Sequence, residues 1–98
     1  MLIKIHEGYR KTVALSDKEL LNKTFTQDKR EIVMHPHFFE GEEKTRQEII
    51  EILKDMQKED ATFNIVGEKS IQTALEAGII KEQGIIKIDN IPIALVLL

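Results

Sequence analysis

The sequence predicts a single α+β domain, in which two main helices and one short helix pack against a mixed, largely antiparallel sheet. A chain of 98 residues is long enough for one hydrophobic core but not for two. Two stretches repeat apolar residues at helical spacing, whereas the other apolar stretches are short and β-prone. No repeat or low-complexity linker divides the chain, so we expect residues 1–98 to form one domain.

The chain begins with the pattern of a β-hairpin. Residues 1–5 alternate in the manner of a strand, Glu7 and Gly8 supply a turn signal, and residues 12–15 form a second apolar stretch. Two apolar stretches joined by a short turn pair antiparallel, so a hairpin is expected here.

A short helix and two further strands are expected next. Ser16 and Glu19 fit the S-x-x-E capping box, which predicts a short helix that continues to Asn22. Residues 23–26 are β-type, and residues 31–35 form a strand pattern with alternate apolar side chains.

The best-supported helix follows a loop at residues 37–41 that Pro36 introduces. Thr45 and Glu48 form a second capping signature at its start. Its apolar side chains recur at spacings of three and four and so form one stripe: Ile49, Ile50, Leu53 and Met56.

The last third of the chain also contains strand and helix patterns. Residues 62–66 are β-prone, residues 68–77 share an apolar face through Ile71, Ala74 and Leu75, and Gly78 closes that helix. Residues 85–88 and 92–98 are expected to be strands, joined by a turn at Asp89-Asn90.

The composition excludes several classes of protein. The chain has no cysteine, so it has neither disulfides nor a thiolate metal site, and no stretch approaches the length of about 18 apolar residues that crosses a membrane. The formal net charge of -3 provides no overall basic field for nucleic acid. The N-terminus lacks a signal-peptide pattern, so a cytoplasmic protein without membrane contacts is expected.

Three groups of residues carry a family resemblance. The most specific is the run Asn64-Ile65-Val66-Gly67-Glu68-Lys69; Ala74, Gly78 and Ile79 follow it, and Ile88-Asp89-Asn90-Ile91-Pro92 comes near the end. In these residues the chain resembles DUF424, an archaeal family of uncharacterised proteins, and the resemblance spans almost its whole length. It implies an archaeal cytoplasmic protein with no established activity, and by analogy a translation or ribonucleoprotein setting.

One segment departs from the family pattern. Where the family tends to place histidine, alanine and glutamine after the proline, this chain has Ile93, Ala94 and Leu95. An activity that used the histidine or the glutamine would therefore be absent from this chain.

The junction of strand 62–66 and helix 68–77 is a candidate ligand site. Asn64, Gly67 and Glu68 lie where free helix amides favour an anion, and Pro92 is the second segment of this site. Glu68 would repel a phosphate, and there is no glycine-rich loop. The alternative is structural: Asn64 bonds a neighbouring turn, and Gly67 supplies an unusual backbone angle.

Two side-chain pairs near residue 37 suggest other sites. His35 and His37 would project to one side of an extended segment and would need Glu40 or His6 as a third metal ligand, so no metal site is assigned. Phe38 and Phe39 are a candidate partner-binding patch, because adjacent aromatic rings on a regular strand point in opposite directions. The alternative is that both rings are buried in the hydrophobic core.

A weak RNA contact is the remaining candidate. Tyr9, Arg10 and Lys11 form one basic group, and Lys29 and Arg30 form another that could converge with it across a sheet edge.

These patterns favour a non-enzymatic binding or adaptor domain with a protein partner, no cofactor and the option of a homodimer. Ser16 and Ser70 are explained as helix-start residues, and no catalytic motif accompanies them. The alternative is a small-molecule or metal-dependent enzyme with a site near Asn64-Glu68 and Pro92. A deep pocket joining these segments would favour the enzyme, and a flat apolar patch would favour the adaptor.

Overall fold

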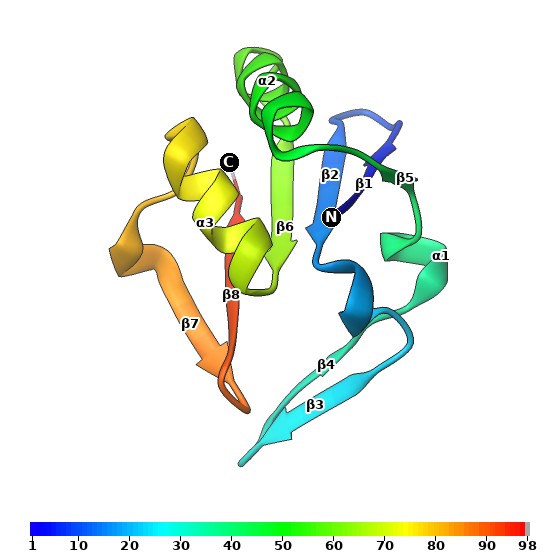
Figure 1. Ribbon diagram of the computed structural model, residues 1–98, viewed down its shortest axis with the longest axis vertical. Coiled ribbons are helices and arrows are strands. Elements are labelled where there is room, and N and C mark those ends of the chain that lie inside the picture. Colours follow the sequence, from blue (N-terminus) through cyan, green and yellow to red (C-terminus); the bar gives the residue numbers. More distant parts are fainter. Residues whose placement is uncertain (98) are drawn as a thin grey trace.

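A six-stranded sheet with the order β5-β1-β2-β6-β8-β7 forms the centre of the computed structural model, which describes residues 1–97 (Figure 1). The strands are β1 (Leu2–His6), β2 (Thr12–Ser16), β3 (Thr24–Gln27), β4 (Arg30–Val33), β5 (Glu42–Glu43), β6 (Thr62–Val66), β7 (Ile85–Ile88) and β8 (Ile91–Val96). The helices are α1 (Pro36–Phe39), α2 (Arg46–Lys58) and α3 (Glu68–Ala77), and two 3₁₀ turns are η1 (Lys18–Leu20) and η2 (Glu82–Gly84).

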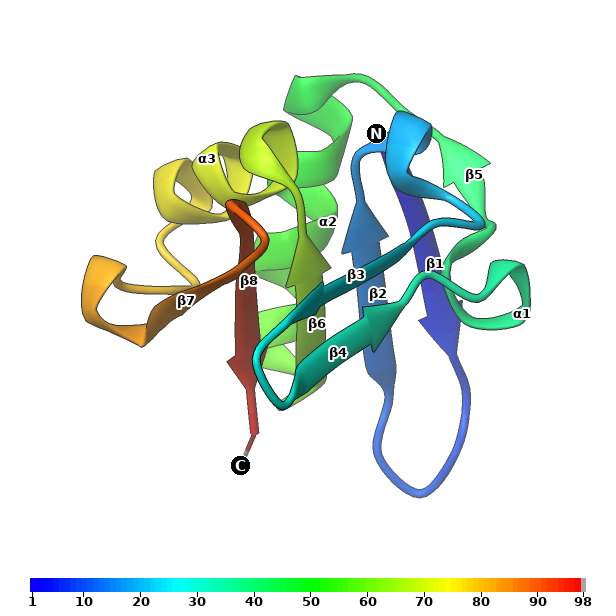
Figure 2. The same cartoon turned by 90° about the horizontal axis from the view of Figure 1, so that it is seen from below.

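The sheet is mostly antiparallel, as the sequence predicts. β2 and β6 run parallel at its centre, with Ala14 opposite Asn64, and the other neighbouring strands run antiparallel. α2 and α3 cover one face, and the hairpin of β3 and β4 crosses in front of the other (Figures 1 and 2). The predicted α+β class is therefore confirmed.

The main core lies between the sheet and the two long helices. The predicted stripe of α2 is buried there, and from α3 Ile71 and Ala74 are buried while Leu75 packs against the cluster half-buried. Phe63 and Ile65 meet them from β6 and are fully enclosed. Burying one such side chain contributes about 1.5–3 kcal/mol, so this layer holds the sheet to the helices.

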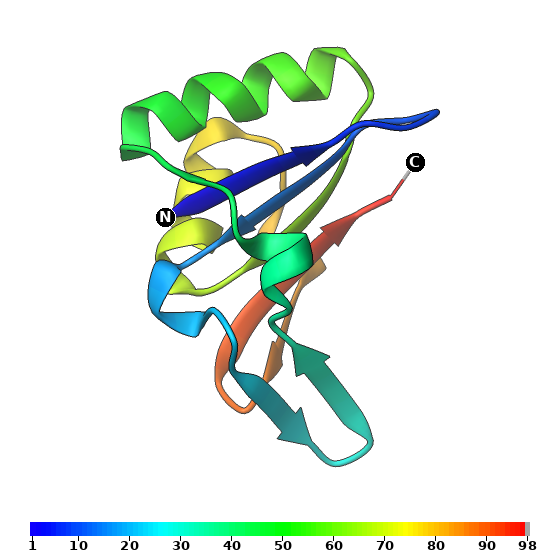
Figure 3. The same ribbon diagram turned by 90° about the vertical axis from the view of Figure 1, so that its right-hand side faces the viewer.

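A smaller apolar cluster covers half of the opposite face. Met34, Phe39 and Leu20 pack there against Ala14 of β2 and Ile93 of β8. The β3–β4 hairpin contributes partly buried side chains to the same cluster. The β3–β4 hairpin lies at the bottom of Figure 3, away from the C-terminal end of β8.

The long helices begin and end as predicted. Thr45 and Glu48 form the capping box of α2, and Gly78 closes α3 in the left-handed conformation. Strands β6 and β7 have the predicted bounds, and the turn at Asp89-Asn90 is present. The last predicted strand is β8, which ends at Val96, and residue 98 lies outside the described residues.

The structure corrects three local predictions. The capping box at Ser16 is wrong, because Ser16 is the last residue of β2 and Asp17 precedes only a 3₁₀ turn. The predicted loop at residues 37–41 contains the one-turn helix α1, which Pro36 starts at a position that proline favours. β5 and η2 were not predicted, since elements of two or three residues leave no periodic pattern.

The capping box of α2 makes stability depend on pH. Glu48 Oε1 accepts hydrogen bonds from the Thr45 amide and hydroxyl, both at 3.0 Å, and these bonds, the backbone one foremost, lower the pKa of the carboxyl. The bonds thus favour the charged form in the fold. Their contribution to the free energy of unfolding is complete above the ordinary carboxyl pKa, and it is lost as the pH falls through the lowered pKa.

Replacing Glu48 with glutamine is therefore expected to destabilise the protein more at neutral pH than in acid. Urea unfolding of both chains over a pH series would measure the gap, which is the difference between their free energies of unfolding. This difference should shrink on acidification. Glu51→Gln, in the same helix, is the matched control and should leave the gap near zero at every pH. A Glu48 gap that stays constant would contradict the assignment.

Candidate functional site

The sheet ends in outer strands that cover only part of their neighbours. β7 pairs with β8 from Ile88 opposite Ile91 as far as Ile85 opposite Ala94. β8 continues to Val96, so within residues 1–97 no β7 residue lies opposite Leu95 or Val96. One end of the sheet therefore presents a strand with an open edge.

Large apolar side chains are exposed beside that edge. Ile86, Leu95 and Leu97, which we call the β7–β8 patch, have 45%, 54% and 72% of their surface exposed. Ile86 lies opposite Ile93 in the register, and Leu95 follows Ile93 by two residues, so these side chains share the face away from the long helices. Leu97 follows directly after the end of β8.

Polar groups border the patch on the same face of the sheet. Asn64 of β6 pairs with Leu95, and its side chain is half-buried. Next to it, the Thr62 hydroxyl donates to the Thr12 hydroxyl at 3.1 Å. The candidate ligand residue Asn64 therefore points to the open sheet face and belongs to the surroundings of the patch.

The other candidate ligand residues lie at the start of α3, where a carboxylate already occupies the helix amides. Asp17 Oδ2 accepts from the Lys69 amide at 3.1 Å, and Asp17 Oδ1 accepts from the Ser70 amide and hydroxyl at 2.8 and 2.7 Å. Gly67 and Pro92 are joined by a 2.9 Å backbone bond beside it. An external anion would therefore have to displace Asp17, which is only 4% exposed.

Gly67 supplies the unusual backbone angle that the structural alternative anticipated. Its φ is +113°, and a Cβ there would lie 2.4 Å from Asp17 Cγ. Glu68 is exposed at the helix start. No local signal in the sequence predicts the role of Asp17, because the residues it binds are more than fifty positions away.

The histidine and phenylalanine pairs lie in and next to the short helix α1. His35 is the N-cap of this helix and His37 lies inside it, so the extended geometry assumed for a shared metal is wrong. Among residues 1–97, no group of three or more His, Cys, Asp or Glu side chains is placed to hold a metal ion. Phe39 is 5% exposed in the smaller cluster, and Phe38 is half-buried against His6, with ring centroids 4.7 Å apart.

The two phenylalanines do not form a free apolar patch in this arrangement. A helical turn, unlike a strand, lets both adjacent rings turn toward the protein, and the Phe38 and Phe39 rings meet edge to face. Exposed apolar side chains lie instead at the β7–β8 patch, which no sequence motif indicates.

The candidate RNA residues lie in two separate turns. Tyr9, Arg10 and Lys11 belong to the β1–β2 connection, and Lys29 and Arg30 to the β3–β4 turn. Figures 1 and 3 place these turns far apart along the longest axis, so they do not converge. Lys11 bonds Glu59 at 2.9 Å, which raises the pKa of Lys11.

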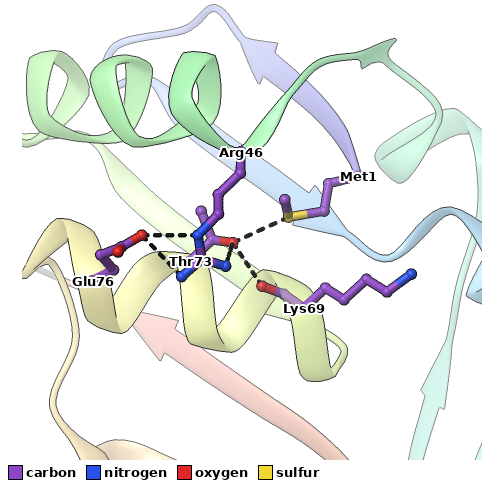
Figure 4. A network of polar contacts seen from close by, with 5 residues as sticks. All are labelled: Met1, Arg46, Lys69, Thr73 and Glu76. Carbon is purple, nitrogen blue, oxygen red and sulfur yellow. Dashed lines mark hydrogen bonds and ion pairs between the residues drawn. The ribbon is translucent and has the colours of Figure 1, made fainter.

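A polar network links the two long helices. Arg46 of α2 reaches Glu76 of α3 at 2.8 and 2.9 Å, and its third nitrogen lies 3.3 Å from the Thr73 hydroxyl (Figure 4). Thr73 donates to the Lys69 carbonyl at 2.7 Å, and its hydroxyl lies 3.3 Å from the Met1 sulfur. The charged groups are about half exposed, so the network orients the helices and contributes little stability.

A cavity adjoins the open edge of β8. It has a volume of about 390 Å³, and its lining includes Gln57, Ile79, Lys81, Gly84 and Val96. Leu95 and Leu97 of the β7–β8 patch line it as well, so the cavity and the patch meet at the end of β8.

Comparisons with known proteins agree on the fold. A family model described as "Protein of unknown function (DUF424)" matches residues 5–98. A solved structure described as an uncharacterized conserved protein from Methanopyrus kandleri is similar at a TM-score of 0.86, with 21% sequence identity over 97% of this chain and 88% of the other. No curated protein matches the sequence significantly.

Proposed function

Because the chain belongs to the DUF424 family, whose description states no activity, we propose a function from its own surface: a non-enzymatic adaptor domain that binds a protein partner through the β7–β8 patch. The related structure comes from Methanopyrus kandleri, which supports an archaeal setting, and we place the protein in the cytoplasm. A translation or ribonucleoprotein setting accords with the exposed basic turns.

One observation carries the proposal, namely the clustering of exposed apolar side chains. Ile86 lies in β7, Leu95 in β8 and Leu97 just after the end of β8, and the three are 45–72% exposed. Scattered apolar residues are ordinary on a protein surface, but a contiguous group next to an open strand edge marks an interaction site. A partner that covered these side chains would remove apolar surface from water.

Asn64 and Thr62 give the patch a polar border. Protein interfaces combine an apolar centre with polar groups at the rim, which fix the orientation of the partner. The half-buried Asn64 amide and the Thr12–Thr62 hydroxyl pair provide such groups within the same sheet face.

Replacing Leu95 with lysine is expected to reduce partner capture at least about tenfold, because the new charge loses its hydration in the interface. The assay is an affinity pull-down from a native lysate of the source organism, with quantitative mass spectrometry and with RNase treatment. Leu95 is more than half exposed, so the fold should survive, and the melting temperature checks this.

Tyr9→Lys is the matched control, because Tyr9 is fully exposed in a turn remote from the patch. It should retain the same partner. If Leu95→Lys also retains the partner, the patch is not the site. If RNase releases the partner from the wild-type chain, the contact is mediated by RNA and the proposal fails.

A further inference from the structure

We propose that the partner supplies an extended peptide strand that pairs with β8 beyond the end of β7, inserts an apolar side chain into the adjoining cavity and places a carboxylate beside Lys81. This inference rests on the proposed function and specifies the kind of partner.

The backbone of β8 carries the first step of the argument. The carbonyl of Pro92 accepts from the Gly67 amide on the β6 side at 2.9 Å. Successive residues direct their amide and carbonyl groups to opposite edges of a strand, so those of Leu95 point to the β7 side, and an extended chain would direct those of Leu97 the same way. β7 begins opposite Ala94, so these peptide groups face a place that an added strand can occupy.

The cavity carries the second step. An extended segment beside Leu95–Leu97 directs alternate side chains to the two faces of the sheet. The cavity of about 390 Å³ lies beside this segment, and its walls include the buried Ile79, the half-buried Val96 and the exposed Leu95 and Leu97. An apolar side chain of the added strand would enter this cavity and cover the exposed leucines.

The charge of the cavity defines the polar part of the ligand. Of the described lining residues, Lys81 alone carries a charge, and Gln57 adds an uncharged amide. A cation in the lining of the cavity complements an aspartate, a glutamate or a terminal carboxylate of the incoming strand.

The other open edge of the sheet gives a contrast. β5 pairs only with Leu2 and Ile3, so within residues 1–97 no β5 residue lies opposite Lys4 or Ile5 of β1. Lys4 lies on that edge, and the cavity of about 360 Å³ beside it is lined by both signs of charge. Charged side chains protect exposed strand edges from pairing. The uncharged run Leu95-Val96-Leu97 lacks this protection, which is why we assign strand addition to β8.

The test selects peptides from a displayed library of random linear sequences on the immobilised full chain. The enriched peptides are synthesised with blocked ends and titrated while the amide NMR signals of the protein are followed. We expect sequences that alternate apolar residues and contain an acidic residue. They should shift the Leu95 and Leu97 amides and slow hydrogen exchange at Leu97.

Two substitutions locate the peptide. A side chain at Gly84 meets no atom within 4 Å of its Cβ and enters open space beside the cavity, so Gly84→Leu should block it while the chain stays folded. Gly8→Leu adds the same side chain in the β1–β2 turn, with its Cβ 3.6 Å from the Arg10 carbonyl, and is the control. Gly84→Leu should weaken peptide binding at least about tenfold and Gly8→Leu should leave it unchanged.

Reversing the charge tests the carboxylate. Lys81→Glu should weaken binding of the acidic peptides, whereas Lys54→Glu, on the exposed face of α2, changes the net charge equally and should not. If the Gly84→Leu chain enriches the same peptides, or if the selected peptides bind it as tightly as they bind the wild-type chain, the proposal is overturned. A wild-type chain that is a dimer and that Gly84→Leu converts to a monomer overturns it in favour of a second copy. If Leu95→Lys loses the lysate partner while Gly84→Leu keeps it, the proposed function stands and strand addition fails.

Discussion

Replacing Gly67 with alanine is expected to lower the free energy of unfolding by about 3–5 kcal/mol, because two costs coincide there. The φ of +113° is unfavourable for any residue with a Cβ. The new Cβ would also lie 2.4 Å from Cγ and 2.7 Å from both carboxylate oxygens of Asp17. Asp17 cannot move aside cheaply, since it is buried and holds the first turn of α3.

Gly78→Ala is the matched control for this prediction. Gly78 has a φ of +78°, but a Cβ there meets nothing within 4 Å. It should therefore cost only the backbone strain, about 1 kcal/mol. Urea unfolding followed by circular dichroism measures both variants. Equal losses for the two glycines would show that the close approach to Asp17 has no energetic weight.

Replacing Asp17 with alanine is expected to cost about 2–4 kcal/mol, because the buried amide and hydroxyl of Ser70 would lose their acceptor. Asp17→Asn should cost less, since one oxygen remains. Glu19→Ala is the control: Glu19 is exposed, and the capping box that the sequence suggested for it is absent, so its loss should stay within about 0.5 kcal/mol.

A double-mutant cycle separates the two predictions. In the Asp17→Ala chain the close contact at Gly67 no longer exists, so Gly67→Ala should then cost only its backbone strain. The loss in the double mutant should therefore be smaller than the sum of the two single losses, by at least about 1 kcal/mol. Strict additivity would mean that Asp17 and Gly67 act independently.

Local patterns in the sequence predicted the parts of the fold that depend on neighbouring residues. Thr45 with Glu48, the stripe of α2 and the closing Gly78 all act within a few positions, and the structure confirms each of them. In the sequence, Pro36 indicates only the start of a loop. Its preference for the first position of a helix would have suggested α1.

The candidate site depended on relations that local patterns do not contain. Asp17 binds the start of α3 only because β2 lies beside β6, and the same Ser-Asp-Lys-Glu run matches a local capping box equally well. Leu95 and Leu97 read as ordinary strand residues. They are exposed because the smaller cluster on this face of the sheet does not include them, a consequence of tertiary packing and not of composition.

The parallel pair at the centre of the sheet determines the order in which this protein can fold. β1 and β2 form a hairpin from residues close in the chain, but β2 meets β6 only after residues 17–61 have been looped out. Closing such a loop costs chain entropy before any contact compensates for it, which slows folding. During synthesis, the β2 edge of the first hairpin therefore stays without its β6 partner until residues 62–66 have emerged.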